Sequence, residues 1–273
     1  MRNEFLNRED YEEPVCPFCT PGHKEPIPLR RIYEKLDTYF DADDTSGAER
    51  HLLYWLSEAE RVNDPHGKMA LYGEQMGLYR KLGRKEEAYT AMERALSEVS
   101  ALGHGDTVTG AVAYLNAATV KKAFGDAAGA ETLYEAARTV FLRELPPNDV
   151  RLASLDNNEA LALTELKRFE EAGTMFLRAL DTLGTDALNA PERAVTYTNL
   201  ADLAVQRLGS EAAQDEVDRY LAAAYSELDR PDVPHDGNYA FVCDKCAPIF
   251  SLYGYFREAA ELSHRADTLY GRK

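Results

Sequence analysis

The sequence predicts an all-α solenoid of about six antiparallel helix pairs, and three observations support this fold class. Ala88, Ala130 and Ala172 lie 42 residues apart, and each is followed by a large apolar residue four positions on and by another alanine seven positions on. Glycine and proline residues interrupt the pattern where hairpins should turn. No segment shows the two-residue alternation of a strand. A motif repeated at this interval is typical of stacked helical units.

The same alanine position, on the second helix of each pair, can be followed through six units. Its members are Ala48, Ala88, Ala130, Ala172, Ala213 and Ala259. The position twelve residues earlier lies on the first helix and is occupied by Leu36, Met76, Ala118, Ala160, Ala201 and Ala247. Two antiparallel helices approach closely where small side chains meet, so these two positions predict the crossing point inside each pair.

Helix-breaking residues mark the ends of the expected elements. Gly83 and Gly125 should end first helices, because glycine readily adopts the left-handed backbone found at a helix C-terminus. Prolines are expected between units, where the chain turns into the next hairpin. They are Pro65, Pro146, Pro147, Pro191, Pro231 and Pro234.

The chain has 273 residues, and six units of about 40 residues each would use nearly all of it. We expect a proline-rich N-terminal tail over residues 1–27, which contains one Cys-x-x-Cys sequence. A single solenoid domain should then occupy residues 28–273.

Composition argues against two classes of partner. The formal net charge is −16, from 47 acidic and 31 basic side chains, and this excess repels phosphate backbones and anionic lipid. No stretch approaches the roughly 18 consecutive apolar residues of a membrane span. The first residues also lack the apolar core of a signal peptide. We therefore expect a cytoplasmic protein that binds neither nucleic acid nor membrane.

Three segments resemble tetratricopeptide repeats (TPR). They are Gly-Arg-Lys-Glu-Glu-Ala at 83–88, Tyr-Leu-Asn-Ala-Ala-Thr-Val-Lys-Lys-Ala-Phe-Gly-Asp at 114–126, and Leu-Lys-Arg-Phe-Glu-Glu-Ala at 166–172. The 42-residue period and the Asn-x-Ala sequence on the first helix are similar to the longer repeats of kinesin light chains. The resemblance covers residues 68–225 well and is weaker at both ends. It implies a right-handed superhelical solenoid that serves as a scaffold for other proteins.

In such a stack the first helices line the concave face, so their residues outside the packing stripe are candidates for contact with a partner. Asn116, Asn158 and Asn199 share one position there. An asparagine amide both donates and accepts hydrogen bonds, so it can hold the backbone of an extended peptide, and the resemblance to kinesin light chains implies this use. The alternative is that the asparagines bridge neighbouring helices, which would produce the same period.

Two basic residues further along the first helices also share a position. Arg80 and Lys122 could receive a carboxylate of the partner against the acidic background of the chain. The alternative is a solvated helix end, because cations are stabilised near the negative pole of the helix dipole.

Four cysteines form two pairs, Cys16 with Cys19 and Cys243 with Cys246, and three interpretations stay open. Four thiolates could bind one zinc ion, which would have to join the two ends of the chain. Cys16-Pro-Phe-Cys19 looks like a glutaredoxin active-site turn, although the prolines that follow it cannot open the helix that such a site needs. Finally, the thiols could be inert, since Cys243 takes a position that is apolar in four other units.

No catalytic residue is indicated. The six histidines form no short-spaced ligand pair, and neither a phosphate-binding glycine loop nor a nucleophile motif is present. The sequence therefore predicts a non-catalytic scaffold that binds another protein or a peptide, with zinc as the only candidate cofactor. One alternative is a zinc-binding or redox-responsive regulator in which the terminal cysteine pairs control the groove. Another is an assembly subunit whose groove is filled by a second copy.

Overall fold

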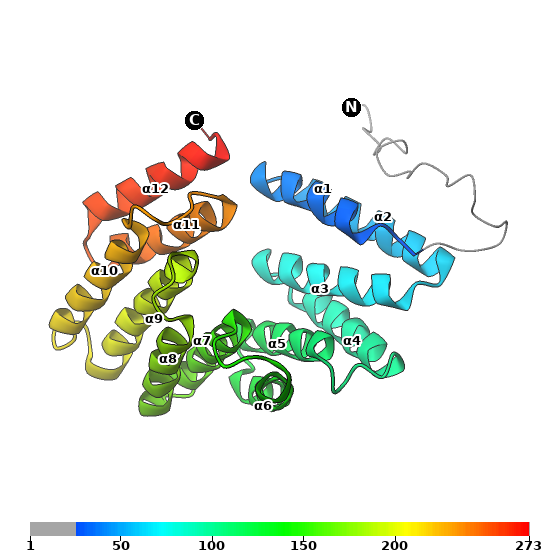
Figure 1. The fold of residues 1–273 in the computed structure, drawn as a ribbon, viewed down its shortest axis with the longest axis horizontal. Coiled ribbons are helices and arrows are strands. Elements are labelled where there is room, and N and C mark those ends of the chain that lie inside the picture. Colours follow the sequence, from blue (N-terminus) through cyan, green and yellow to red (C-terminus); the bar gives the residue numbers. More distant parts are fainter. Residues whose placement is uncertain (1–25, 273) are drawn as a thin grey trace. The chain divides into compact units, whose positions relative to one another are not determined.

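The structure is a computed structural model that describes residues 26–272. Within these residues it contains twelve α-helices, one short 3-10 helix and no strand (Figure 1). The helices are α1 (Leu29–Asp41), α2 (Thr45–Val62), α3 (Pro65–Lys81), α4 (Lys85–Ala101), α5 (Val108–Ala123), α6 (Ala127–Glu144), α7 (Val150–Glu165), α8 (Phe169–Leu183), α9 (Ala190–Leu208), α10 (Gln214–Leu228), α11 (Gly237–Leu252) and α12 (Phe256–Tyr270). The prediction of an all-α fold is confirmed.

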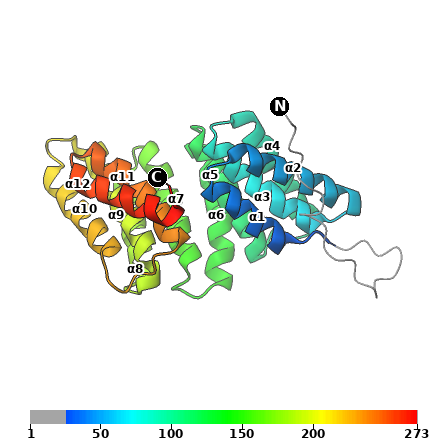
Figure 2. The same ribbon diagram turned by 90° about the horizontal axis from the view of Figure 1, so that it is seen from above.

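The chain divides into two compact units, and the boundary between Val120 and Lys121 falls inside α5. In the first unit α1 packs on α2 and α3 packs on α4, while α2 also contacts α3. In the second unit the packed pairs are α7 with α8, α9 with α10, and α11 with α12 (Figures 1 and 2). Contacts of α6 with α7, α8 with α9, and α9 with α11 join neighbouring elements. The single domain over 28–273 stays a prediction.

The repeated alanine position is buried in all six units. Its exposed fraction is 0% at Ala48, Ala88, Ala130, Ala172 and Ala213, and 7% at Ala259. The paired position on the first helix is also buried throughout, with at most 4% exposure at Ala247. Ala160 and Ala172 belong to one core cluster, and Ala201 and Ala213 belong to another. The small residues therefore lie inside the hairpins, as the repeat predicts.

An Asp-x-x-Gly sequence begins three helices, a signal that the sequence interpretation missed. It occurs at Asp44–Gly47 in α2, at Asp64–Gly67 in α3 and at Asp126–Gly129 in α6. The backbone N–H of Gly129 donates to Oδ1 of Asp126 at 2.9 Å, which caps the helix. A Cβ on Gly129 would lie 2.2 Å from Oδ2 of the same aspartate, so any other residue here would force the Asp126 carboxylate to shift.

Two predicted stops are also confirmed in the backbone. Gly83 has φ of 68° and Gly125 has φ of 86°, and both follow a first helix. Glycine adopts this left-handed conformation without the steric cost that a Cβ would bring.

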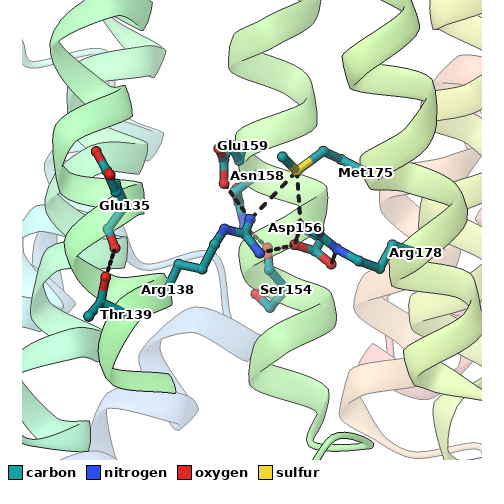
Figure 3. Close-up of polar contacts among 9 residues, drawn as sticks. All are labelled: Glu135, Arg138, Thr139, Ser154, Asp156, Asn158, Glu159, Met175 and Arg178. Carbon is teal, nitrogen blue, oxygen red and sulfur yellow. Dashed lines mark hydrogen bonds and ion pairs between the residues drawn. The ribbon is translucent and has the colours of Figure 1, made fainter. Parts of the chain in front are cut away.

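A buried ion-pair cluster joins α6, α7 and α8 (Figure 3). Its centre is Asp156 on α7, which is only 2% exposed. Arg138 from α6 contacts Asp156 at 2.7 Å and also pairs with Glu159. Arg178 from α8 donates two hydrogen bonds to the Asp156 carboxylate, at 2.7 and 2.6 Å. The cluster thus links the α7–α8 hairpin to α6 through ion pairs.

His51 should make the stability of the first compact unit, which ends at Val120, depend on pH. The ring of His51 on α2 is fully buried, and its Nε2 lies 3.0 Å from the carbonyl oxygen of Ile32 on α1. Burial lowers the pKa of His51 from 6.5, and the charge of Lys35 lowers it further, while the hydrogen bond to Ile32 opposes the shift. The unfolded chain therefore binds a proton more readily than the folded chain does.

We predict that this stability is complete above the unfolded pKa of about 6.5 and is lost as the pH falls through the lower folded pKa. Thermal unfolding of wild type and His51→Gln between pH 7.5 and 5 tests the prediction. The melting temperature of wild type should fall more steeply with acidification than that of the variant. Parallel pH profiles for the two proteins would contradict it.

Candidate partner-binding groove

A groove of about 250 Å³ crosses the first helices α7, α9 and α11 within the second unit. Side chains of all three helices line it, and they combine amides, apolar groups and two charges. Its lining includes Val150, Asn157 and Asn158 from α7, Glu192, Val195 and Asn199 from α9, and Asn238, Phe241 and Lys245 from α11. Val150 and Phe241 are 43% and 55% exposed, so apolar surface is presented to solvent along the groove.

Two of the three predicted asparagines lie in this groove. Asn158 is half-buried on α7, and its Nδ2 donates to the carbonyl oxygen of Ser154 one turn earlier in the same helix, at 2.9 Å. Asn199 is half-buried on α9. Asn116 is exposed on α5, in the unit that ends at Val120. Partner binding by these residues stays a prediction.

A line of polar contacts connects the three helices along the groove. Nδ2 of Asn199 donates to Oδ1 of Asn157 at 3.1 Å, and Nδ2 of Asn157 donates to the hydroxyl of Thr196. That hydroxyl donates to the main-chain carbonyl of Glu192 at 2.8 Å. Nδ2 of Asn238 on α11 donates to Oε1 of Glu192 at 2.9 Å. Asn199 therefore bridges two helices, which is the alternative role considered for the asparagines.

The amides of the groove keep hydrogen-bonding capacity beyond these contacts. An asparagine side chain offers two donor hydrogens and two acceptor lone pairs. Of these four hydrogen-bonding positions, the contacts described use one at Asn158, one at Asn199 and two at Asn157. Amide groups with unused capacity at a groove can hydrogen-bond the backbone of a guest chain.

The sequence interpretation missed Asn157, Glu192, Asn238 and Phe241. Ala172 and Ala213 are 41 residues apart, so in this register Asn158 rather than Asn157 corresponds to Asn199, and the repeat carried no signal for Asn157. Glu192 and Asn238 carry no signal either, because their contact depends on how α11 packs against α9.

The two predicted basic residues lie at helix ends in different units. Arg80 is exposed in the last turn of α3, and Lys122 is half-buried in the last turn of α5. Next to Lys122, Lys121 pairs with Asp126 at 2.8 Å. A carboxylate contact for Arg80 and Lys122 stays a prediction.

The C-terminal cysteine pair is part of the core. Cys243 and Cys246 are both 0% exposed and belong to the same cluster as Tyr239 and Phe250. Burial raises the pKa of Cys243 to about 11, a shift that its hydrogen bond with Tyr239 opposes. Burial raises the pKa of Cys246 to about 12. Both thiols are therefore protonated near neutral pH in the metal-free chain, which disfavours nucleophilic chemistry by this pair.

Cys16 and Cys19 lie outside the described residues, so the four-thiolate zinc site stays a prediction. Between residues 26 and 272, no group of three or more histidine, cysteine or acidic side chains is arranged to hold a metal ion. In the same part of the chain, no helix combines the length and the apolar character needed to span a bilayer.

Comparison with known proteins supports the fold. No protein-family model matches the sequence, and no curated protein matches it significantly. The chain is similar in structure to BtubC (BKLC) from P. vanneervenii, with 22% identity and a TM-score of 0.54 over 85% of this chain and 91% of that one. It is also similar to kinesin light chain TPR-like repeats of Podosopora anserina, with 14% identity and a TM-score of 0.50 over 74% and 95% of the two chains. These likenesses show a TPR-like solenoid, as predicted.

Proposed function

We propose that this chain is a non-catalytic scaffold that binds an extended segment of a partner protein in the groove across α7, α9 and α11. The observation that carries the proposal is the groove itself, which joins exposed apolar side chains to amides with unused hydrogen-bonding capacity. Apolar contacts supply affinity, and amides pair with the backbone of a peptide whatever its side chains are.

The spacing of the helices favours an extended guest. Packed helices lie about 10 Å apart, so the path from α7 over α9 to α11 covers about 20 Å. An extended chain advances about 3.3 Å per residue, and about six residues would span this path. Their side chains would alternate between the groove and solvent, which allows selection by side chain at every second position.

Selection from a phage library of random dodecamer peptides tests the proposal. We expect enriched peptides that bind wild type and lose about tenfold in affinity for Phe241→Ser, because this substitution removes apolar contact area worth about 1.4 kcal/mol. Fluorescence polarisation with labelled synthetic peptides measures the loss.

Leu142→Ser is the matched control, since Leu142 is 64% exposed on α6 and does not line the groove. Its peptide affinity should equal that of wild type. The proposal fails when no peptide is enriched, or when the two variants bind the enriched peptides equally well.

A further inference from the structure

Glu192 is the one acidic residue among the described residues that line the groove. Its Oε2 atom is buried and has no hydrogen-bond partner among residues 26–272. A buried carboxylate oxygen without a donor is rare in folded proteins, because its lost hydration is not replaced. Glu192 itself is half-buried and lines the groove, so its carboxylate is an acceptor whose capacity is not filled by the described residues.

The hydrogen bonds and ion pairs of the described residues give Glu192 no cationic partner. Its other oxygen, Oε1, accepts from Asn238, which is uncharged. Arg193, the next residue along the chain, donates instead to Glu227 at 2.6 Å and to the carbonyl oxygen of Asp186 at 2.8 Å. Glu192 also lies in the first turn of α9, where the helix dipole stabilises negative charge.

The groove presents apolar surface on both sides of this carboxylate. Val150 on α7 and Phe241 on α11 are exposed, while Val195 is half-buried one turn after Glu192. Lys245 on α11 also lines the groove, so the groove is not uniformly acidic. Selectivity for a basic side chain is therefore expected at one position of the guest only.

We infer that the guest carries an arginine or lysine whose cationic head pairs with Glu192, flanked by apolar residues that contact Val150 and Phe241. This inference rests on the proposed function and specifies the chemistry of the partner. Because Oε2 has no accessible surface, the cationic head pairs with it when the Glu192 side chain rotates toward the groove. A guanidinium or ammonium group then supplies both the missing donor and the opposite charge, and a charge-assisted hydrogen bond is stronger than a neutral one. The long apolar stem of either side chain also suits the apolar surroundings.

The peptides enriched on wild type test the inference directly. They should share an arginine or lysine at one position, and replacing it with norleucine should weaken binding to wild type about tenfold or more. Glu192→Gln keeps the size of the side chain and an acceptor for Asn238 but removes the charge. Norleucine replacement should therefore change binding to Glu192→Gln by less than about twofold. Glu165→Gln, an exposed residue of α7 that does not line the groove, is the matched control and should behave like wild type.

The outcomes separate the two proposals. Enriched peptides that depend on Phe241 but share no basic position, or that bind Glu192→Gln as wild type does, would overturn the inference and leave the proposed function standing. The absence of any peptide that depends on Phe241 would overturn both. Thermal unfolding of Glu192→Gln is the folding control. A melting temperature close to that of wild type would show that a loss of binding reflects the lost charge and not unfolding.

Discussion

Replacing Phe176 with alanine should lower the free energy of unfolding by about 4 kcal/mol. Phe176 on α8 has no exposed surface, and its core cluster contains Ala160 from α7 together with Leu200 and Leu203 from α9. One side chain therefore packs inside its own hairpin and against the next hairpin. Truncation removes the transfer free energy of the ring and leaves a cavity between two repeats.

Urea unfolding followed by circular dichroism measures this loss. The matched control is Leu177→Ala, because Leu177 is the next residue of the same helix and is 57% exposed. Its substitution should change the free energy of unfolding by less than about 0.5 kcal/mol. Similar losses for the two variants would show that the repeat register assigned to α8 is wrong.

Replacing Arg138 with methionine should cost about 3 kcal/mol, because Arg178 still pairs with Asp156 but the largely buried Glu159 loses its ion-pair partner. Arg138 holds both Asp156 and Glu159, and the side chain of Asp156 is only 3% exposed (Figure 3). Methionine keeps most of the apolar stem, so the loss reports the charge rather than the packing. Glu159 would then keep none of its ion pairs in this cluster.

Arg178→Met provides the comparison within the same cluster. Arg178 is 46% exposed, and its removal leaves Asp156 paired with Arg138. We expect a loss of about 1 kcal/mol or less, as for partly solvated ion pairs. Urea unfolding measures the free energy of unfolding of both variants. If Arg138→Met loses no more of it than Arg178→Met, the roles assigned to the two arginines are wrong.

The fold was predictable from the sequence because one geometric requirement recurs. Wherever two helices cross closely, a small residue is needed, and this requirement places alanine at Ala130 and again at Ala172. The cysteine prediction rested on the same register. Cys243 is buried as its apolar position in other units predicts, and Cys246 is buried as well.

The groove was only partly predictable. Asn158 and Asn199 are visible as a periodic pair on the first helices, and both line the groove. The unpartnered oxygen of Glu192 was not predictable, because it results from the positions of groups on other elements. Asn238 on α11 satisfies one oxygen, and Glu227 on α10 engages the neighbouring arginine. Such contacts depend on the packing of successive hairpins, so the repeat pattern does not predict them.

A crystal structure of the chain bound to one enriched peptide would show directly where the guest lies. We expect an extended peptide across α7, α9 and α11, with its backbone hydrogen-bonded to Asn158 and a basic side chain at Glu192. A peptide bound on the second helices α8, α10 or α12, or a guest that folds as a helix in the groove, would contradict this expectation.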